Sequence, residues 1–135
     1  MHYLHYIVLT ALIACGTPEP ISPTLGHYVG AQEALANDNF PKAQAALKSL
    51  VQHADPVLKP LVIKAANASD ITAVRAAFKP LSAEIIKNEV PEGYVRAYCS
   101  MADGDRGAHW IQKDQSRLMN PYFGATMLHC GVFKD

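Results

Sequence analysis

Soft sulfur ligands gather in the C-terminal third of this chain. Apart from Met1 and Cys15, every cysteine and methionine lies in this region: Cys99, Met101, Met119, Met127 and Cys130. Thiolate and thioether sulfurs select soft ions such as Cu(I), whereas carboxylates prefer harder ions. The composition of this region therefore predicts a sulfur-lined metal site.

Local spacing determines which of these sulfurs can share a face. If the segment around Cys99 is a strand, Cys99 and Met101 point to the same side, because side chains alternate along a strand. A helical turn would likewise place Met127 and Cys130 on one face. If the segment around Met127 is a strand instead, Met127 and His129 lie on one face and Cys130 points to the other. Joining the two cysteine–methionine pairs would give a two-cysteine, two-methionine site.

His109 and Trp110 are the remaining candidates beside this sulfur cluster. His109 would add an imidazole ligand, and Trp110 would cap a bound Cu(I) through a cation–π contact. Each also has a purely structural interpretation: His109 as a surface residue, and Trp110 as the buried indole that anchors the C-terminal region. The methionines have one too, because flexible thioethers commonly fill gaps in a core.

A disulfide is the alternative chemistry for the two cysteines. In an oxidising compartment Cys99 and Cys130 would pair, and the loop-entropy model gives such a bond about 3.7 kcal/mol of stabilisation. A permanent disulfide would remove both thiolates and leave only methionine and histidine ligation. The residues alone leave both the metal site and the disulfide open.

The N-terminal sequence indicates the cellular compartment in which the two cysteines are expected to lie. Residues 6–14 form an uncharged apolar run that is too short to span a bilayer and is typical of a secretory signal peptide. The run ends at Cys15 in a pattern that resembles a bacterial lipobox, in which the cysteine is acylated. We therefore expect a signal peptide over residues 1–14 and a lipidated, proline-rich tether over residues 15–24. Gly16 resembles the residue found in lipoproteins sorted to the outer membrane, so we expect a lipid anchor facing the periplasm.

Apolar residues recur at helical spacing through the first part of the mature chain. The stripes run over residues 25–36, 43–51, 58–66 and 71–85. Asp55 is expected to cap the third helix, and Ser69 or Asp70 the fourth. Pro60 and Pro80 should each kink a helix, and Pro80 leaves open whether the fourth helix splits in two. Short connections between these helices predict an antiparallel four-helix bundle.

The helical spacing of apolar residues ends near residue 94. Residues 94–101 have strand-like spacing, residues 108–114 form a candidate second strand, and a glycine-rich turn lies between them. The final residues are ambiguous between a helical turn and a strand. We therefore expect a mainly α fold: one domain over residues 25–135, whose residues 94–135 form a small β-hairpin or irregular cap.

Composition excludes several functions. Lysine plus arginine equals aspartate plus glutamate, 12 against 12, so the chain lacks the basic excess typical of nucleic-acid binding. Contact with a membrane is expected through the lipid anchor only. The sequence has neither a Cys-x-x-Cys spacing nor an identifiable catalytic base, so we expect a protein that is not an enzyme.

The motifs "YCSMADGDRGAHWIQ" and "NPYFGATMLHCG" resemble a bacterial periplasmic family of domains of unknown function. Its signature runs Cys-Pro-Met-Ala, Gly-Ala-x-Trp-Leu-Gln, Asn-Pro-Tyr-x-Gly, Met-Leu and Cys-Gly. The family also occurs fused to CusB-type adaptor proteins of heavy-metal efflux pumps, which implies a heavy-metal role. The candidate site residues that match the signature are Cys99, Met101, Trp110, Met127 and Cys130. Ser100 stands where the family usually has proline, and His109 occupies a variable position.

The residues and the resemblance together predict a periplasmic lipoprotein that binds copper as Cu(I), or a similar soft heavy metal. It would buffer the ion or transfer it to an efflux adaptor or a cuproprotein. The predicted metal ligands are Cys99, Met101, His109, Met127 and Cys130. The alternative is a protein-interaction module without metal, stapled by a Cys99–Cys130 disulfide.

Overall fold

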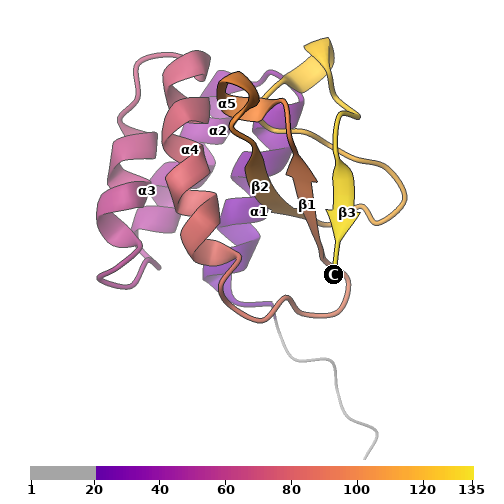
Figure 1. Cartoon of the computed structure of the whole chain (residues 1–135). Helices are drawn as coiled ribbons and strands as arrows, with labels where there is room; N and C mark the ends of the chain where they lie inside the picture. The colour runs from indigo at the N-terminus through magenta and orange to yellow at the C-terminus, as the bar shows by residue number, and fades with distance from the viewer. Residues whose placement is uncertain (1–20) are drawn as a thin grey trace, which may run out of the picture.

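A computed structural model describes residues 21–135, so the predictions for residues 1–14 and for Cys15 lie outside the described residues. A group of helices lies beside a small sheet (Figure 1). The elements are α1 (Pro23–Ala36), α2 (Phe40–Val51), α3 (Lys59–Ala66), α4 (Ile71–Ile85), β1 (Val95–Cys99), α5 (Ala102–Asp105), β2 (Ala108–Gln112), the 3-10 helix η1 (Gly124–Thr126) and β3 (Val132–Lys134). The predicted mainly α fold is confirmed. Within residues 21–135, no helix has the length and apolar character needed to cross a bilayer.

Side-chain caps set the start of the three long helices. Ser22 caps α1, Asn39 caps α2 and Asp70 caps α4, each accepting the N–H of the residue three positions on. Such a cap satisfies one of the N–H groups that a helix start leaves without a partner. Of the two residues expected to begin the fourth helix, Ser69 and Asp70, the structure has Asp70 as the cap.

The third helix begins later than the sequence predicts. The Asp55 carboxylate accepts the N–H groups two and three residues on, so it caps a turn, and α3 starts only at Lys59. Pro60 consequently lies in the first turn of α3, where proline removes no helix hydrogen bond. The kink predicted at Pro60 is therefore wrong. Helix α4 runs as one element through Pro80.

Tyr28 of α1 joins the helices to the sheet. Its ring stacks on Phe78 of α4 with 5.0 Å between ring centroids, and its hydroxyl hydrogen-bonds Ser82 at 2.7 Å. The same hydroxyl oxygen accepts the N–H of Ile111 in β2 at 3.3 Å. Complete burial raises the pKa of Tyr28 far above its ordinary value. A single fully buried residue therefore ties together α1, α4 and β2.

The sheet has three antiparallel strands in the order β2-β1-β3. Strands β1 and β2 form the predicted hairpin, in which Ala97 pairs with Trp110 and Cys99 pairs with Ala108. Strand β3, which the sequence leaves ambiguous, pairs with the other edge of β1. Figure 1 shows β3 beside β1, so the residues just before β3 lie next to the end of β1.

Arg75 of α4 ties the C-terminal segment to the helices. Its guanidinium donates to the carbonyl oxygens of Pro121 at 2.9 Å and Leu35 at 2.7 Å, and to the Asp38 carboxylate at 2.8 Å. The second oxygen of Asp38 accepts the N–H of Ala125 at 3.0 Å. These contacts hold residues 121–125 against the end of α1.

We expect Asp38→Asn to make the free energy of unfolding depend less on pH in the acid range than it does in the wild type. The Arg75 hydrogen bond, followed by the Ala125 N–H, lowers the pKa of Asp38 in the folded chain. A carboxyl group with a lowered pKa stabilises the fold above its ordinary pKa of about 3.9, and this contribution disappears as pH falls through the lowered value. Urea unfolding at about pH 7 and pH 3 measures the effect. Equal acid sensitivity in Asp38→Asn and the wild type would contradict it; Glu33→Gln, an exposed change on α1, is the control.

Candidate functional site

Cys99 and Cys130 lie side by side, with their Sγ atoms 2.8 Å apart, and both are free cysteines. Cys99 is completely buried at the end of β1, and Cys130 is partly exposed just before β3. Pairing of β3 with β1 brings together these residues, which are distant in the sequence. The sequence predicted that the two cysteines share a site, and the structure places them in direct contact.

Asn120 holds the segment that carries Cys130. Its side-chain amide donates to the Cys130 carbonyl oxygen at 2.9 Å, and its own N–H donates to Leu128. A further bond from the Cys130 N–H to the Met127 carbonyl oxygen closes a short turn. Asn120 is completely buried, so these bonds lie where water does not compete with them. They position Cys130 although it lies outside any helix or strand.

Gly131 follows Cys130 with a φ of +138°, a conformation that side chains disfavour. A Cβ atom there would lie 2.7 Å from the Tyr98 carbonyl oxygen and 3.1 Å from the Trp110 ring. We therefore expect Gly131→Ala to lower the free energy of unfolding by about 1–3 kcal/mol and to separate the thiols. Urea unfolding and the alkylation rate of the two cysteines measure this. Gly26→Ala, where a Cβ meets nothing within 4 Å, is the control; if both variants behave alike, the steric argument is wrong.

The surroundings of the two thiols are apolar. The buried residues packed around them are Ala97, Ala102, Ala108 and Trp110. The hydrogen bond with Cys99, followed by burial, raises the pKa of Cys130 to about 11. Cys130 is therefore protonated near neutral pH, and a metal ion that binds to its sulfur must displace that proton.

Trp110 is completely buried on the face of the sheet that carries Cys99. Its ring packs edge-on against Tyr122, with 6.1 Å between ring centroids and 72° between ring planes. Its indole N–H donates to the side chain of Gln112 at 2.8 Å. These contacts make Trp110 a packing anchor of the C-terminal region.

Gln112 is a structural residue of this site that was not among the predicted site residues. Besides accepting from Trp110, its side-chain oxygen accepts the N–H of Met119 at 2.8 Å. Its amide group donates to the carbonyl oxygens of Asp114 and Arg117. Two signals pointed to it: the glutamine that ends the Gly-Ala-x-Trp-Leu-Gln signature, and its position two residues after Trp110, which places it on the same face of β2.

Met101 does not lie where the two-pair geometry requires. Strand β1 ends at Cys99, and Met101 precedes α5 with 49% of its surface exposed. The alternation that would place it beside Cys99 therefore does not reach it. Met127 lies at the end of η1 and, like Met119, is partly buried. The structure thus brings the two cysteines together and leaves Met101 at the surface.

His109 lies on the opposite face of the sheet from Cys99. It pairs with Tyr98, and the two rings lie 4.6 Å apart. Burial, and then the charge of Lys134, lowers the pKa of His109, which favours its neutral form. The exposed His129 ring bonds the Leu118 carbonyl oxygen at 2.7 Å. In the described part of the chain, no group of three or more His, Cys, Asp and Glu side chains is arranged to hold a metal.

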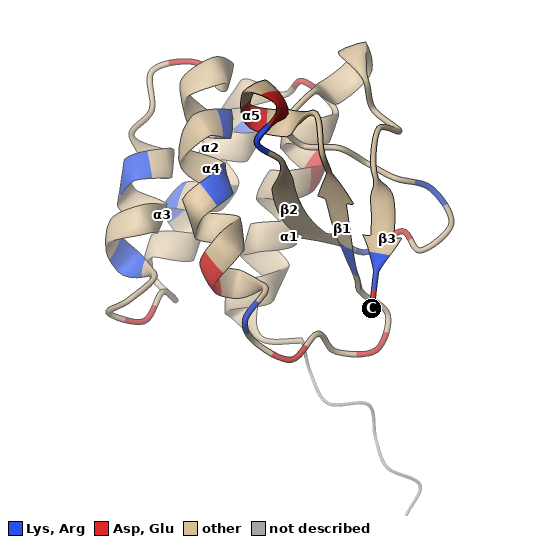
Figure 2. Cartoon of the chain, viewed as in Figure 1, with Lys and Arg blue, Asp and Glu red and all other residues tan. Residues whose placement is uncertain are grey.

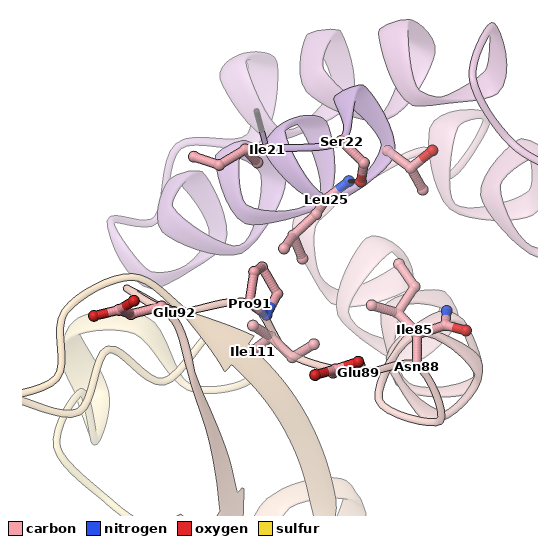
Figure 3. Close-up of a pocket in the computed structure, with 10 residues that line it drawn as sticks. Ile21, Ser22, Leu25, Ile85, Asn88, Glu89, Pro91, Glu92 and Ile111 are labelled. Atoms are coloured by element: carbon pink, nitrogen blue, oxygen red, sulfur yellow. Dashed lines mark hydrogen bonds between the residues drawn. The ribbon is translucent and has the colours of Figure 1, made fainter. Parts of the chain in front are cut away.

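A pocket of about 530 Å³ lies away from the cysteines, between the start of α1, the end of α4 and β2. Figure 3 shows Leu25, Ile85 and Ile111 facing this space, with Glu89 and Glu92 at its margin. Charged residues are mixed over the surface, with lysines on α3 and acidic residues in the loop after α4 (Figure 2).

No family model matches the chain, and comparisons with curated proteins and with solved structures gave no match.

Proposed function

We propose that the chain is a non-catalytic envelope protein that binds Cu(I) between Cys99 and Cys130. The observation that carries the proposal is the contact between the two thiols, 2.8 Å apart. Two thiolates are soft ligands, and soft ligands favour Cu(I) over hard ions. Partial exposure of Cys130 gives an ion access to a pair whose other member is buried.

Binding requires the two sulfurs to separate. With metal–sulfur bonds of about 2.3 Å, two ligand sulfurs on one ion lie roughly 4 Å apart. Cys99 is fixed in a strand, whereas Cys130 belongs to an irregular segment, so Cys130 is the residue that would move. Each thiol loses its proton when it becomes a ligand.

The other predicted ligands have unequal support. Met127 is three residues from Cys130 and partly buried, so it is the preferred third ligand. Met101 would have to turn inward from the surface, and His109 would have to cross the sheet. We therefore propose Cys99, Cys130 and then Met127 as ligands, with Trp110 as the packed wall of the site.

The biological setting rests on the sequence. The lipobox-like Cys15 and the family resemblance support a lipid-anchored protein that faces the periplasm. Copper would be buffered there, or passed to an efflux adaptor or a cuproprotein. The antiparallel four-helix bundle also belongs to this proposal; its support is the packing of neighbouring helices along the chain and the contact of α1 with α4 through Tyr28.

Competition with a chromophoric Cu(I) chelator tests the proposal. The reduced full chain with Cys15→Ser leaves two thiols and should take one copper ion. Cys99→Ser and Cys130→Ser should each weaken binding by at least about tenfold, and Met127→Leu should have a smaller effect. Met101→Leu, at an exposed position, is the matched control. Failure to compete with the chelator, or an affinity in both serine variants equal to that of the chain with Cys99 and Cys130 intact, would rule the proposal out.

The same sulfur contact favours a second candidate, a module stapled by a Cys99–Cys130 disulfide that binds a partner protein rather than metal. A disulfide requires an S–S bond of about 2.05 Å, so these thiols need only a small approach. Counting thiols under denaturing, non-reducing conditions separates the candidates. Two thiols in freshly isolated Cys15→Ser protein favour the copper site, and none favours the staple.

A further inference from the structure

His27 and His53 form a second pair of metal-ligating side chains, separate from the cysteines. His27 belongs to α1, and His53 lies in the turn that follows α2. Their rings stack with 5.1 Å between centroids and 24° between planes. His27 is partly exposed and His53 is exposed. Two imidazoles from different elements therefore meet at the surface.

The backbone around this histidine pair is fixed on both sides. The Thr24 hydroxyl, one turn before His27, donates to the His53 carbonyl oxygen at 3.0 Å. The His53 N–H donates to Leu50 at 3.0 Å and so continues the last turn of α2. These bonds join the first turn of α1 to the turn after α2. Proximity of the rings therefore follows from the fold, and only side-chain rotation is needed to reorient them.

The separation of the rings fits a single metal ion. Imidazole nitrogens bind transition metals at about 2.0–2.1 Å, which places the ion roughly 3 Å from each ring centre. Two rings 5.1 Å apart are closer than twice that distance, so one ion can reach both. The rings are stacked in this structure, so rotation about χ1 and χ2 must turn a nitrogen of each ring toward a common point before one ion can bind both. Within residues 21–135, no hydrogen bond or ion pair involves either ring, so none has to break when the rings turn.

We infer that His27 and His53 form a surface site for a divalent transition-metal ion, with water in the remaining positions. Imidazole suits Zn²⁺, Ni²⁺ and Cu²⁺, and the general order of affinity places Cu²⁺ first and Mn²⁺ last. This site goes beyond the proposed Cu(I) function, because it uses different residues, a different ligand type and ions of a different charge.

Zn²⁺ titration by calorimetry tests the inference in the full chain. His2→Ala and His5→Ala form the background, since these residues lie outside the described part. We expect one zinc ion to depend on the histidine pair, and His27→Ala and His53→Ala each to weaken it by at least about tenfold. His129→Ala removes an exposed imidazole whose ring nitrogen already bonds Leu118, and should leave that affinity unchanged.

Spectroscopy identifies the ligands directly. With Cu²⁺, the electron paramagnetic resonance spectrum should show coupling to two imidazole nitrogens, reduced to one in either single variant. Thermal melting without metal checks that each variant folds. A zinc stoichiometry and affinity that stay unchanged in both His27→Ala and His53→Ala, in folded protein, would overturn the site. Cys99→Ser does not alter these histidines, so loss of Cu(I) binding in that variant leaves this result independent.

Discussion

Trp110→Ala should lower the free energy of unfolding by about 3–5 kcal/mol, the range for truncating a large buried aromatic residue. The indole is completely buried, and its removal takes away the edge-on contact with Tyr122. It also removes the donor that Gln112 accepts at 2.8 Å. Because Gln112 also holds Asp114, Arg117 and Met119, loss of the indole loosens the loop that leads to the second half of the sulfur site. Urea unfolding measures the change.

Trp110→Phe separates packing from hydrogen bonding. Phenylalanine keeps an aromatic ring beside Tyr122 but cannot donate to Gln112, so we expect a smaller loss than for Trp110→Ala. Ile63→Ala is a matched control at an apolar position that is 40% exposed, and it should change stability by less than about 1 kcal/mol. If Trp110→Ala costs no more than Ile63→Ala, Trp110 does not anchor the C-terminal region.

Oxidation of Cys99 and Cys130 should raise the free energy of unfolding by about 3.7 kcal/mol, the loop-entropy value for cysteines 31 residues apart. Oxidised glutathione supplies the chemistry: two thiols become one disulfide, and two molecules of reduced glutathione are released. The thiols already touch, so the bond closes with little movement of the fold. The same oxidation should abolish the proposed Cu(I) binding, because neither sulfur is then available as a thiolate.

Denaturation of the oxidised and reduced Cys15→Ser chain measures the stabilisation. Cys130→Ser, treated in the same way, cannot form the bond and should show no gain. An oxidised chain no more stable than the reduced one would mean that closure strains the native geometry. Copper binding undiminished after complete oxidation would mean that these cysteines are not the ligands.

Most of the helical structure could be predicted from local chemistry. The Asp70 cap and the apolar periodicity of α1, α2 and α4 depend on neighbouring residues only, so the sequence suffices. Asp55 shows where prediction from local sequence fails, because an aspartate side chain can cap either a helix or an isolated turn. The start of α3 at Lys59 follows from how the chain packs after that turn, which no local pattern encodes.

The sulfur site shows a similar division. The proximity of Cys99 and Cys130 could be predicted from the sequence, because a shared metal ion and a disulfide both require the two cysteines to meet. The position of Met101 could not be predicted, because strand alternation applies only while the strand continues, and β1 ends two residues earlier. The pairing of β3 with β1 is non-local, so neither the register beside Cys130 nor the histidine pair was visible in the sequence.

The X-ray absorption spectrum of the reduced Cys15→Ser chain loaded with one equivalent of Cu(I) tests the copper proposal most directly. We predict a shell of at least two sulfur atoms at the short metal–thiolate distance of about 2.3 Å, reduced by one sulfur in Cys130→Ser. A shell of nitrogen or oxygen alone, or a sulfur shell unchanged when both Cys99 and Cys130 are replaced by serine, would contradict the account.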